Sequence, residues 1–363
     1  MKKPVIAVVL GTRPEIIKVS PILSELKRQR TKYVLIHTGQ HYSLVMDRIF
    51  FTDLHMQEPD FLLGVGSGTH GEQTGKILMR IEKVLIKIKP NIVLVEGDTN
   101  SVLAAALAAT KLRIQVGHIE AGLRSFYREM PEEINRILTD HISDYLFAPT
   151  HISKENLLNE GIDARKIYIT GNTIVDAIIR NRRRAQRKSK ILTKVAIAGD
   201  HFMLLTLRRA ENLENKQRLK EILSAVIELC KEYLIIFPVH PRTKNRLKDF
   251  KLLKNLKSTK KLRLLEPLGY LDFLKLQSNA QLILTDSGGI QEESCILNIP
   301  CVTLRDNTER PETIAIGSNI LGGCKRQTIM HAVKIMLKKR RKWKQPFGNG
   351  TSAEKIVAIL TKT

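Results

Sequence analysis

The sequence lacks the long apolar runs that would place the chain in a membrane. No apolar stretch approaches the roughly 18 residues that a spanning helix needs. The apolar segment after Lys2 and Lys3 is too short for a signal peptide and leads into Arg13 and Glu15. We therefore interpret residues 5–10 as the first buried strand, and we expect no membrane partner.

Cysteine is scarce, and its spacing excludes several kinds of site. The chain has four cysteines and none of them forms a C-x-x-C pair. Because Cys230, Cys295 and Cys301 lie in apolar surroundings, we expect reduced thiols in a cytoplasmic protein. There is no H-E-x-x-H motif or Cys/His cluster, so we expect no metal and no cofactor. The segment 71–76 has the wrong spacing for a P-loop, and residues 11–18 have too few glycines for a dinucleotide fingerprint.

Acidic residues are also few, and the imbalance lies in the second half of the chain. The net charge is +24, with 23 basic against 20 acidic residues up to position 180 and 37 against 16 beyond it. Such an excess attracts nucleic acids nonspecifically. The basic runs, however, alternate with Leu and Ile at helical spacing, and only 5% of the residues are aromatic. Solvated helix faces explain this pattern better than a specific nucleic-acid site.

The length and the order of elements predict two α/β domains. A chain of 363 residues is long for one core, and 43% apolar with 26% charged residues is typical of a globular protein. Buried strands alternate with helices in both halves, which favours doubly wound parallel sheets facing a cleft. We place an N-terminal domain at 1–175 and a C-terminal domain at 176–349. The basic segment 178–190 is interpreted as the connection between them.

The stretch from Leu282 to Glu312 has the pattern of a diphosphate-binding site. An apolar strand leads through Ser287, Gly288 and Gly289 into a helix, whose free N–H groups favour an anion. Glu293, one turn into the helix, is placed to accept hydrogen bonds from ribose hydroxyls. A second strand then delivers a charged cluster at 305–312 to the same edge of the sheet. The alternative is an ordinary tight turn followed by a solvated loop.

Three carboxylates lie where strands of the first half end. Asp98 and Glu120 each follow a strand, and Glu132 opens a helix after Pro131. Their side chains are expected to converge above one edge of the sheet, as candidates for acid–base chemistry. The alternative is that Asp98 and Glu132 only stabilise the N-termini of helices.

Eight sequence blocks, taken together, resemble the non-hydrolysing UDP-N-acetylglucosamine 2-epimerase family. They occur in the family's order between residues 11 and 312. The blocks are GTRPEIIK (11–18), GDTNS (97–101), HIEAGLRS (118–125), PEEINR (131–136), GNTIVDA (171–177), HPRT (240–243), LTDSGGIQEE (284–293) and RDNTERPE (305–312).

The resemblance implies a fold, a reaction and a setting. The fold is two Rossmann-like domains in the GT-B arrangement of a large class of nucleotide-sugar glycosyltransferases, with residues 350–363 packing back on the first domain. The reaction is the reversible conversion of UDP-GlcNAc to UDP-ManNAc, through elimination of UDP to 2-acetamidoglucal and re-addition. The expected partners are UDP, the two UDP-sugars and a second copy of the chain, and the expected role is synthesis of surface polysaccharide or glycan precursors.

The resemblance also implies roles for individual residues. The catalytic positions are Asp98, Glu120 and Glu132. A second UDP-GlcNAc site, regulatory in many bacterial members, corresponds to Gln40, His41 and Arg209. The expected UDP-sugar contacts are Arg13, Lys18, His240, Phe273, Ser287, Gly288, Gly289, Glu293 and Arg310.

One position departs from the family pattern. The family block reads Thr-Leu-His-Arg-Ala-Glu-Asn, and Arg208 stands in place of its functional histidine. An arginine can hold a diphosphate but does not exchange a proton near neutral pH. Two alternatives therefore stand beside the epimerase: a catalytically impaired UDP-sugar-binding homologue or inactive variant, and a related UDP-sugar hydrolase or transferase.

Overall fold

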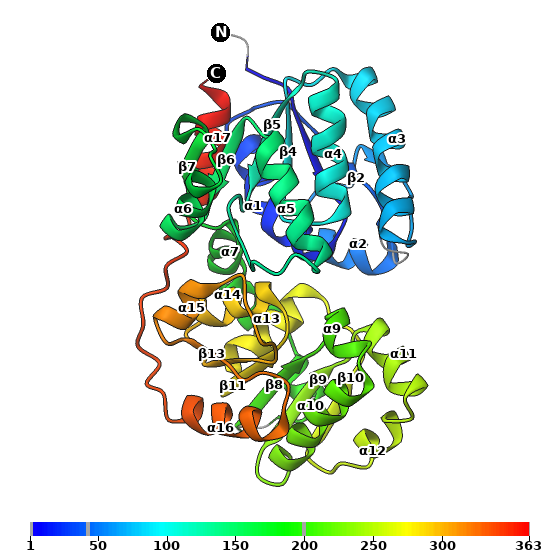
Figure 1. Ribbon diagram of the computed structural model, residues 1–363, viewed down its shortest axis with the longest axis vertical. Helices are drawn as coiled ribbons and strands as arrows, with labels where there is room; N and C mark the ends of the chain where they lie inside the picture. Colours follow the sequence, from blue (N-terminus) through cyan, green and yellow to red (C-terminus); the bar gives the residue numbers. More distant parts are fainter. Residues whose placement is uncertain (1–2, 41–43, 198–200, 363) are drawn as a thin grey trace. The chain divides into compact units, whose positions relative to one another are not determined.

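A computed structural model describes residues 3–40, 44–197 and 201–362 (Figure 1). The chain divides into two compact units, residues 1–179 with 347–363 and residues 180–346. Each unit is built around one parallel sheet with helices connecting its strands. The predicted fold class, two doubly wound parallel-sheet α/β domains, is confirmed. Within the described ranges, we find no helix with the length and apolar character of a bilayer span.

The first unit contains a seven-stranded parallel sheet in the order β3-β2-β1-β4-β5-β6-β7. Its strands are β1 (Ile6–Leu10), β2 (Tyr33–His37), β3 (Phe61–Leu62), β4 (Ile92–Glu96), β5 (Gln115–Ile119), β6 (Tyr145–Ala148) and β7 (Ile167–Ile169). Its helices are α1 (Arg13–Arg28), α2 (Leu44–Asp53), α3 (His70–Ile88), α4 (Asn100–Lys111), α5 (Pro131–Ile142), α6 (His151–Asn159) and α17 (Ser352–Thr361). The strand order reverses between β1 and β4, which makes the carboxyl ends of these strands a binding edge.

The second unit repeats the plan with six parallel strands in the order β10-β9-β8-β11-β12-β13. Its strands are β8 (Phe202–Thr206), β9 (Leu234–Pro238), β10 (Leu262–Leu265), β11 (Leu282–Thr285), β12 (Cys301–Thr303) and β13 (Asn319–Leu321). Its helices are α8 (Ile191–Lys194), α9 (Ala210–Leu213), α10 (Lys216–Leu229), α11 (Pro241–Asp249), α12 (Leu253–Lys257), α13 (Tyr270–Asn279), α14 (Gly288–Ile296), α15 (Pro311–Ala315) and α16 (Arg326–Leu337). Here the order reverses between β8 and β11.

Small side chains let helices approach the first sheet closely. Helix α4 buries Ala104, Ala105, Ala108 and Ala109, and it packs beside α3 and α5 (Figure 1). An alanine side chain occupies little space, so the helix can pack close to its neighbours and the sheet. The core of this unit therefore lies directly behind the strand ends that carry the candidate acids.

The segment 178–190, predicted to connect the two domains, is largely helical and contains the boundary between the two units. It continues helix α7 (Thr173–Lys188), which carries a buried stripe of Ile174, Ile178, Asn181 and Ala185. The spacing of four, three and four residues is that of a helix face. The sequence analysis missed the second half of this stripe because asparagine and alanine do not read as large apolar residues.

The C-terminal helix α17 belongs to the first unit and contacts α1 (Figure 1). It buries Ile356, Val357 and Leu360. The Asp176 carboxylate accepts hydrogen bonds from Ser352 N at 3.3 Å and Ala353 N at 3.0 Å. These contacts satisfy N–H groups that open the helix and attach it to its unit.

We expect Gly122→Ala to destabilise the protein far more than Gly161→Ala. Both glycines have positive φ, +81° and +82°, so an alanine strains the backbone at either site. A Cβ at Gly122 would lie 2.1 Å from the Ser153 carbonyl oxygen, whereas a Cβ at Gly161 meets nothing within 4 Å. Denaturant unfolding should give a loss of about 1 kcal/mol for Gly161→Ala and of more than about 3 kcal/mol for Gly122→Ala. Equal losses would contradict this packing.

Candidate active site

The predicted acids of the first unit lie at the carboxyl ends of β4 and β5 and at the start of α5. Asp98 follows β4, Glu120 follows β5, and Glu132 is in the first turn of α5. The Asn135 side chain of α5 donates to the Asp98 carbonyl at 2.9 Å. Helix α5 is thereby attached to the loop that carries Asp98, so all three acids belong to one edge of this sheet.

Glu120 lies in a buried polar cluster with Lys18. The Lys18 ammonium is 2.5 Å from Glu120 Oε1 and 3.2 Å from Glu96 Oε1, and the Asn172 side-chain amide donates to Glu120 Oε1 at 2.6 Å. Glu120 has a φ of +68°, which is unusual for a residue other than glycine. The contacts with Lys18 and Asn172 fix the Glu120 side chain and so help to keep the backbone at this φ. The sequence analysis found Lys18 and Glu120, but it missed Glu96, whose position at the end of an apolar strand was the available signal.

Asp98 is held by an arginine that the sequence analysis also missed. Arg136 Nη2 donates to Asp98 Oδ2 and Arg136 Nη1 donates to Glu133 Oε2, both at 2.5 Å. Glu133 in turn accepts from the backbone N–H groups of Ser125 and Phe126. This fixed carboxylate locks the arginine, and the arginine orients Asp98. Asp98 is not the cap of α4, because Thr99 is its N-cap and accepts from Val102 N.

A buried histidine supports the backbone beside Asp98. His118 Nε2 lies 2.7 Å from the Gly97 carbonyl oxygen and Nδ1 lies 2.7 Å from Asp140 Oδ1. A carbonyl oxygen only accepts, so Nε2 carries the hydrogen. Burial favours the neutral acid at Asp140, but His118 and Arg124 outweigh it and hold the pKa of Asp140 below its usual value. Asp140 orients His118, and His118 in turn holds the Gly97 carbonyl in place.

The remaining first-unit positions are near these strands. Arg13 begins α1, and its guanidinium carbon lies 5.7 Å from the centre of the Phe50 ring. Gln40 is buried, and its side-chain oxygen accepts from the Ser101 hydroxyl at 2.7 Å. His41, proposed with Gln40 for a second sugar-nucleotide site, lies outside the described residues.

In the second unit, the predicted diphosphate-binding site lies where the strand order reverses. The Thr206 and Thr285 hydroxyls, at the ends of β8 and β11, are 2.6 Å apart. Ser287 is the N-cap of α14, and Gly288 and Gly289 are its first residues. Three of the predicted contacts are therefore at a helix N-terminus, which provides free N–H groups for an anion.

Gly288 packs closely against the side chain of Glu309. A Cβ there would lie 2.2 Å from Glu309 Oε1, whereas a Cβ at Gly289 meets nothing within 4 Å. The Glu309 carboxylate also forms ion pairs with Arg305 Nη1 at 2.8 Å and with Arg209 Nη2 at 3.1 Å. A buried acid, Glu309, therefore lies against the start of α14, and the two arginines compensate its charge.

The loop with Arg208 is fixed through its backbone. Asp286 is fully buried, and its carboxylate accepts from Arg208 N and Arg209 N at 3.0 Å. The Arg208 side chain is exposed. Its backbone position therefore does not depend on which side chain stands there.

The other predicted contacts of the second unit occupy neighbouring elements. Arg310 precedes α15, and its Nε is 2.5 Å from the buried Glu292. Glu293 is 7% exposed, whereas His240 is exposed as the N-cap of α11. Phe273 is in the first turn of α13 and partly buried. His240 and Arg310 lie directly before helices, whereas Glu293 and Phe273 lie within α14 and α13.

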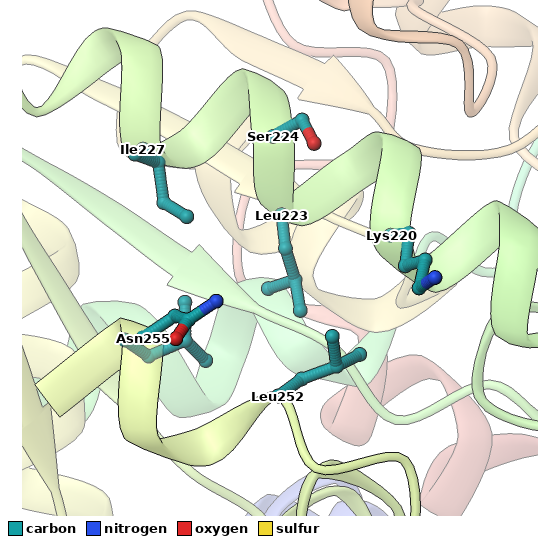
Figure 2. A pocket seen from close by; sticks show the side chains of 7 residues that line it. Lys220, Leu223, Ser224, Ile227, Leu252 and Asn255 are labelled. Atoms are coloured by element: carbon teal, nitrogen blue, oxygen red, sulfur yellow. The ribbon is translucent and has the colours of Figure 1, made fainter.

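A separate hollow of about 230 Å³ lies between α10 and α12. Figure 2 shows that Leu223, Leu252 and Asn255 line it together with Lys220, Ser224 and Ile227. No predicted site residue is among its lining residues. Across the described ranges, no group of three or more His, Cys, Asp or Glu side chains could hold a metal ion.

Comparisons with known proteins identify the family of this chain. A family model described as UDP-N-acetylglucosamine 2-epimerase matches residues 24–361. The UDP-N-acetylglucosamine 2-epimerase of Methanocaldococcus jannaschii is 59% identical over 361 residues, which is 98% of each chain.

Solved structures give the same result. A crystal structure of Methanocaldococcus jannaschii UDP-GlcNAc 2-epimerase in complex with UDP-GlcNAc and UDP has a TM-score of 0.96 and 58% identity, covering 99% of this chain and 100% of that chain. A glycosyltransferase from Rickettsia africae shares the fold alone, with a TM-score of 0.62 and 15% identity over 100% of this chain and 99% of that chain. The chain belongs to the UDP-N-acetylglucosamine 2-epimerase family.

Proposed function

We propose that this protein interconverts UDP-GlcNAc and UDP-ManNAc by inverting the configuration at C2. The observation that carries the proposal is the near-complete match to the Methanocaldococcus jannaschii epimerase, whose crystal structure holds UDP-GlcNAc and UDP. The acids at the strand ends of the first unit and the helix N-terminus of the second supply the chemical groups that this reaction needs.

The chemistry explains why several acids are required. The C2 hydrogen is not next to a carbonyl, so its removal depends on departure of UDP from C1, where positive charge develops. Elimination gives 2-acetamidoglucal, and UDP then adds back while a proton is delivered to the opposite face of C2. Both faces therefore need an acid or a base. We assign these duties to Asp98, Glu120 and Glu132.

UDP departs more readily when its developing charge is stabilised. We propose that Ser287, Gly288 and Gly289 bind the diphosphate at the N-terminus of α14 and that Arg310 neutralises it. Glu293 would accept from ribose hydroxyls. The remaining proposed contacts are Arg13, Lys18, His240 and Phe273.

We also infer a regulatory site and a setting for the protein. Gln40, His41 and Arg209 correspond to a second UDP-GlcNAc site. We place the activity in the cytoplasm, in the supply of precursors for surface polysaccharides or glycans.

The central test is incubation of the purified protein with UDP-GlcNAc in heavy water, followed by proton NMR. We expect UDP-ManNAc to appear with deuterium at C2, because proton removal and return exchange that hydrogen with solvent. Unchanged sugar together with saturable UDP binding would favour a binding protein instead. Accumulation of free UDP and free sugar would favour a hydrolase.

We expect Arg208→His to raise turnover and to leave the KM for UDP-GlcNAc within about threefold. Asp286 fixes the backbone at this position, so the substitution changes the side chain without moving the loop. An imidazole at this point adds a group able to exchange protons, and such groups contribute roughly 100-fold or more to rate. Arg208→Lys is the matched control, which keeps the charge without an imidazole and should give no gain. Unchanged turnover in Arg208→His would show that the position does not limit catalysis.

We propose a homodimer as the working form. The observation behind it is membership in a family for which dimers are expected, together with exposed apolar side chains such as Met79 and Ile86 on α3. Light scattering on the purified protein should give about twice the chain mass of 41.2 kDa. A mass of one chain over the working concentration range would reject the dimer.

A further inference from the structure

Glu96 lies next to the proposed acid–base residue Glu120, in a place where water is excluded. Glu96 is 1% exposed, Glu120 is 5% exposed and Lys18 is 6% exposed. The Lys18 ammonium contacts both carboxyl groups, at 3.2 Å and 2.5 Å. Two buried acids therefore share one buried cation.

The charges of this cluster do not balance if both acids are ionised. Two carboxylates and one ammonium leave an excess negative charge away from water, which is costly. Helix α1 adds a further buried acid, Glu15, and burial raises its pKa to about 7 despite three hydrogen bonds to its carboxylate. A third acid adds no positive charge, and the contacts of the cluster therefore favour a proton on one carboxyl group of the pair.

The hydrogen bonds indicate which acid holds it. Glu120 Oε1 accepts from both Lys18 and Asn172, as an ionised carboxylate does. The Glu96 and Glu120 carboxyl groups meet at the same ammonium, and a hydrogen bond between two carboxyl groups requires a proton on one of them. Burial above all, and then the charges of Glu120 and Glu15, raise the pKa of Glu96 well above its usual value even though Lys18 opposes this.

We propose that Glu96 is a positioning residue that stays protonated and donates a hydrogen bond to Glu120, so that Glu120 remains ionised and oriented for acid–base work at C2. The role of Glu120 rests on the proposed function. The protonation of Glu96 does not, since it follows from the burial and contacts of the cluster alone. Lys18, Glu96, Glu120 and Asn172 all belong to the first unit.

The protonation state is tested by NMR on protein labelled with carbon-13 at the δ carbon of glutamate. At pH 7 we expect one resonance at the shift of a protonated carboxylic acid that disappears in Glu96→Gln. Glu15→Gln identifies the Glu15 resonance, which titrates in the same range. Glu25→Gln is the matched control, because Glu25 is another buried glutamate of α1 whose partners are Arg28 and Gln29. It should leave the Glu96 resonance in place.

A Glu96 resonance at the carboxylate shift at pH 7 would overturn the proposal. This measurement needs no turnover, so failure of the proposed function and failure of the Glu96 inference would be seen separately.

Kinetics then tests the positioning role. A glutamine side chain can donate to Glu120 as the protonated acid does, so Glu96→Gln should keep kcat within about threefold of the parent. Glu96→Leu removes the donor, and we expect kcat to fall about tenfold or more with little change in KM. If Glu96→Gln loses as much kcat as Glu96→Leu, Glu96 acts in another way and the proposal is wrong. Full kcat in Glu96→Leu would overturn it as well.

Discussion

The site of the first unit depends on the ammonium of Lys18, buried between two carboxyl groups. Helix α1 brings this cation under the ends of β4 and β5, where Glu96 and Glu120 are located. Without it, two acids would lie together in a region that water does not reach. The lysine also helps to hold Glu120 at a positive φ, a conformation that costs free energy and persists only under firm constraint. The position of Glu120, the proposed acid–base residue, therefore depends on its contact with Lys18 of α1.

The two units share one arrangement of strands and polar groups. Each has a parallel sheet whose strand order reverses at its centre, and each gathers polar groups at the carboxyl ends there. In each unit, a buried carboxylate accepts hydrogen bonds from backbone N–H groups. Glu133 fixes the turn at Ser125 and Phe126, and Asp286 fixes the loop at Arg208. The side chains that these loops carry can therefore differ while the loops keep their shape. Position 208 can therefore carry an arginine, in place of the histidine that the resemblance predicts, while the loop keeps its backbone.

Much of this protein was determined by its sequence. The alternation of buried runs and helical segments predicted the two parallel-sheet domains, and the strand predicted at residues 5–10 is β1, Ile6–Leu10. Local preference is also visible at the start of α1, where Thr12 is the N-cap and Pro14 lies in the first turn. These features depend on local preferences and on strand and helix periodicity, which neighbouring residues reveal. The short edge strands β3 and β13 were missed, because two or three residues paired on one side leave little pattern.

Only the tertiary structure decided which charged groups meet. Arg136 and Asp98 are 38 positions apart, and Lys18 and Glu120 are 102 positions apart. Sequence spacing does not encode such distances, since they follow from the order in which strands join the sheet. The sequence could place Asp98, Glu120 and Glu132 at strand or helix ends, but it gave no partner for any of them. Glu96 looked like the end of a strand, and it became part of an acid pair only because β4 and β5 lie side by side beneath α1.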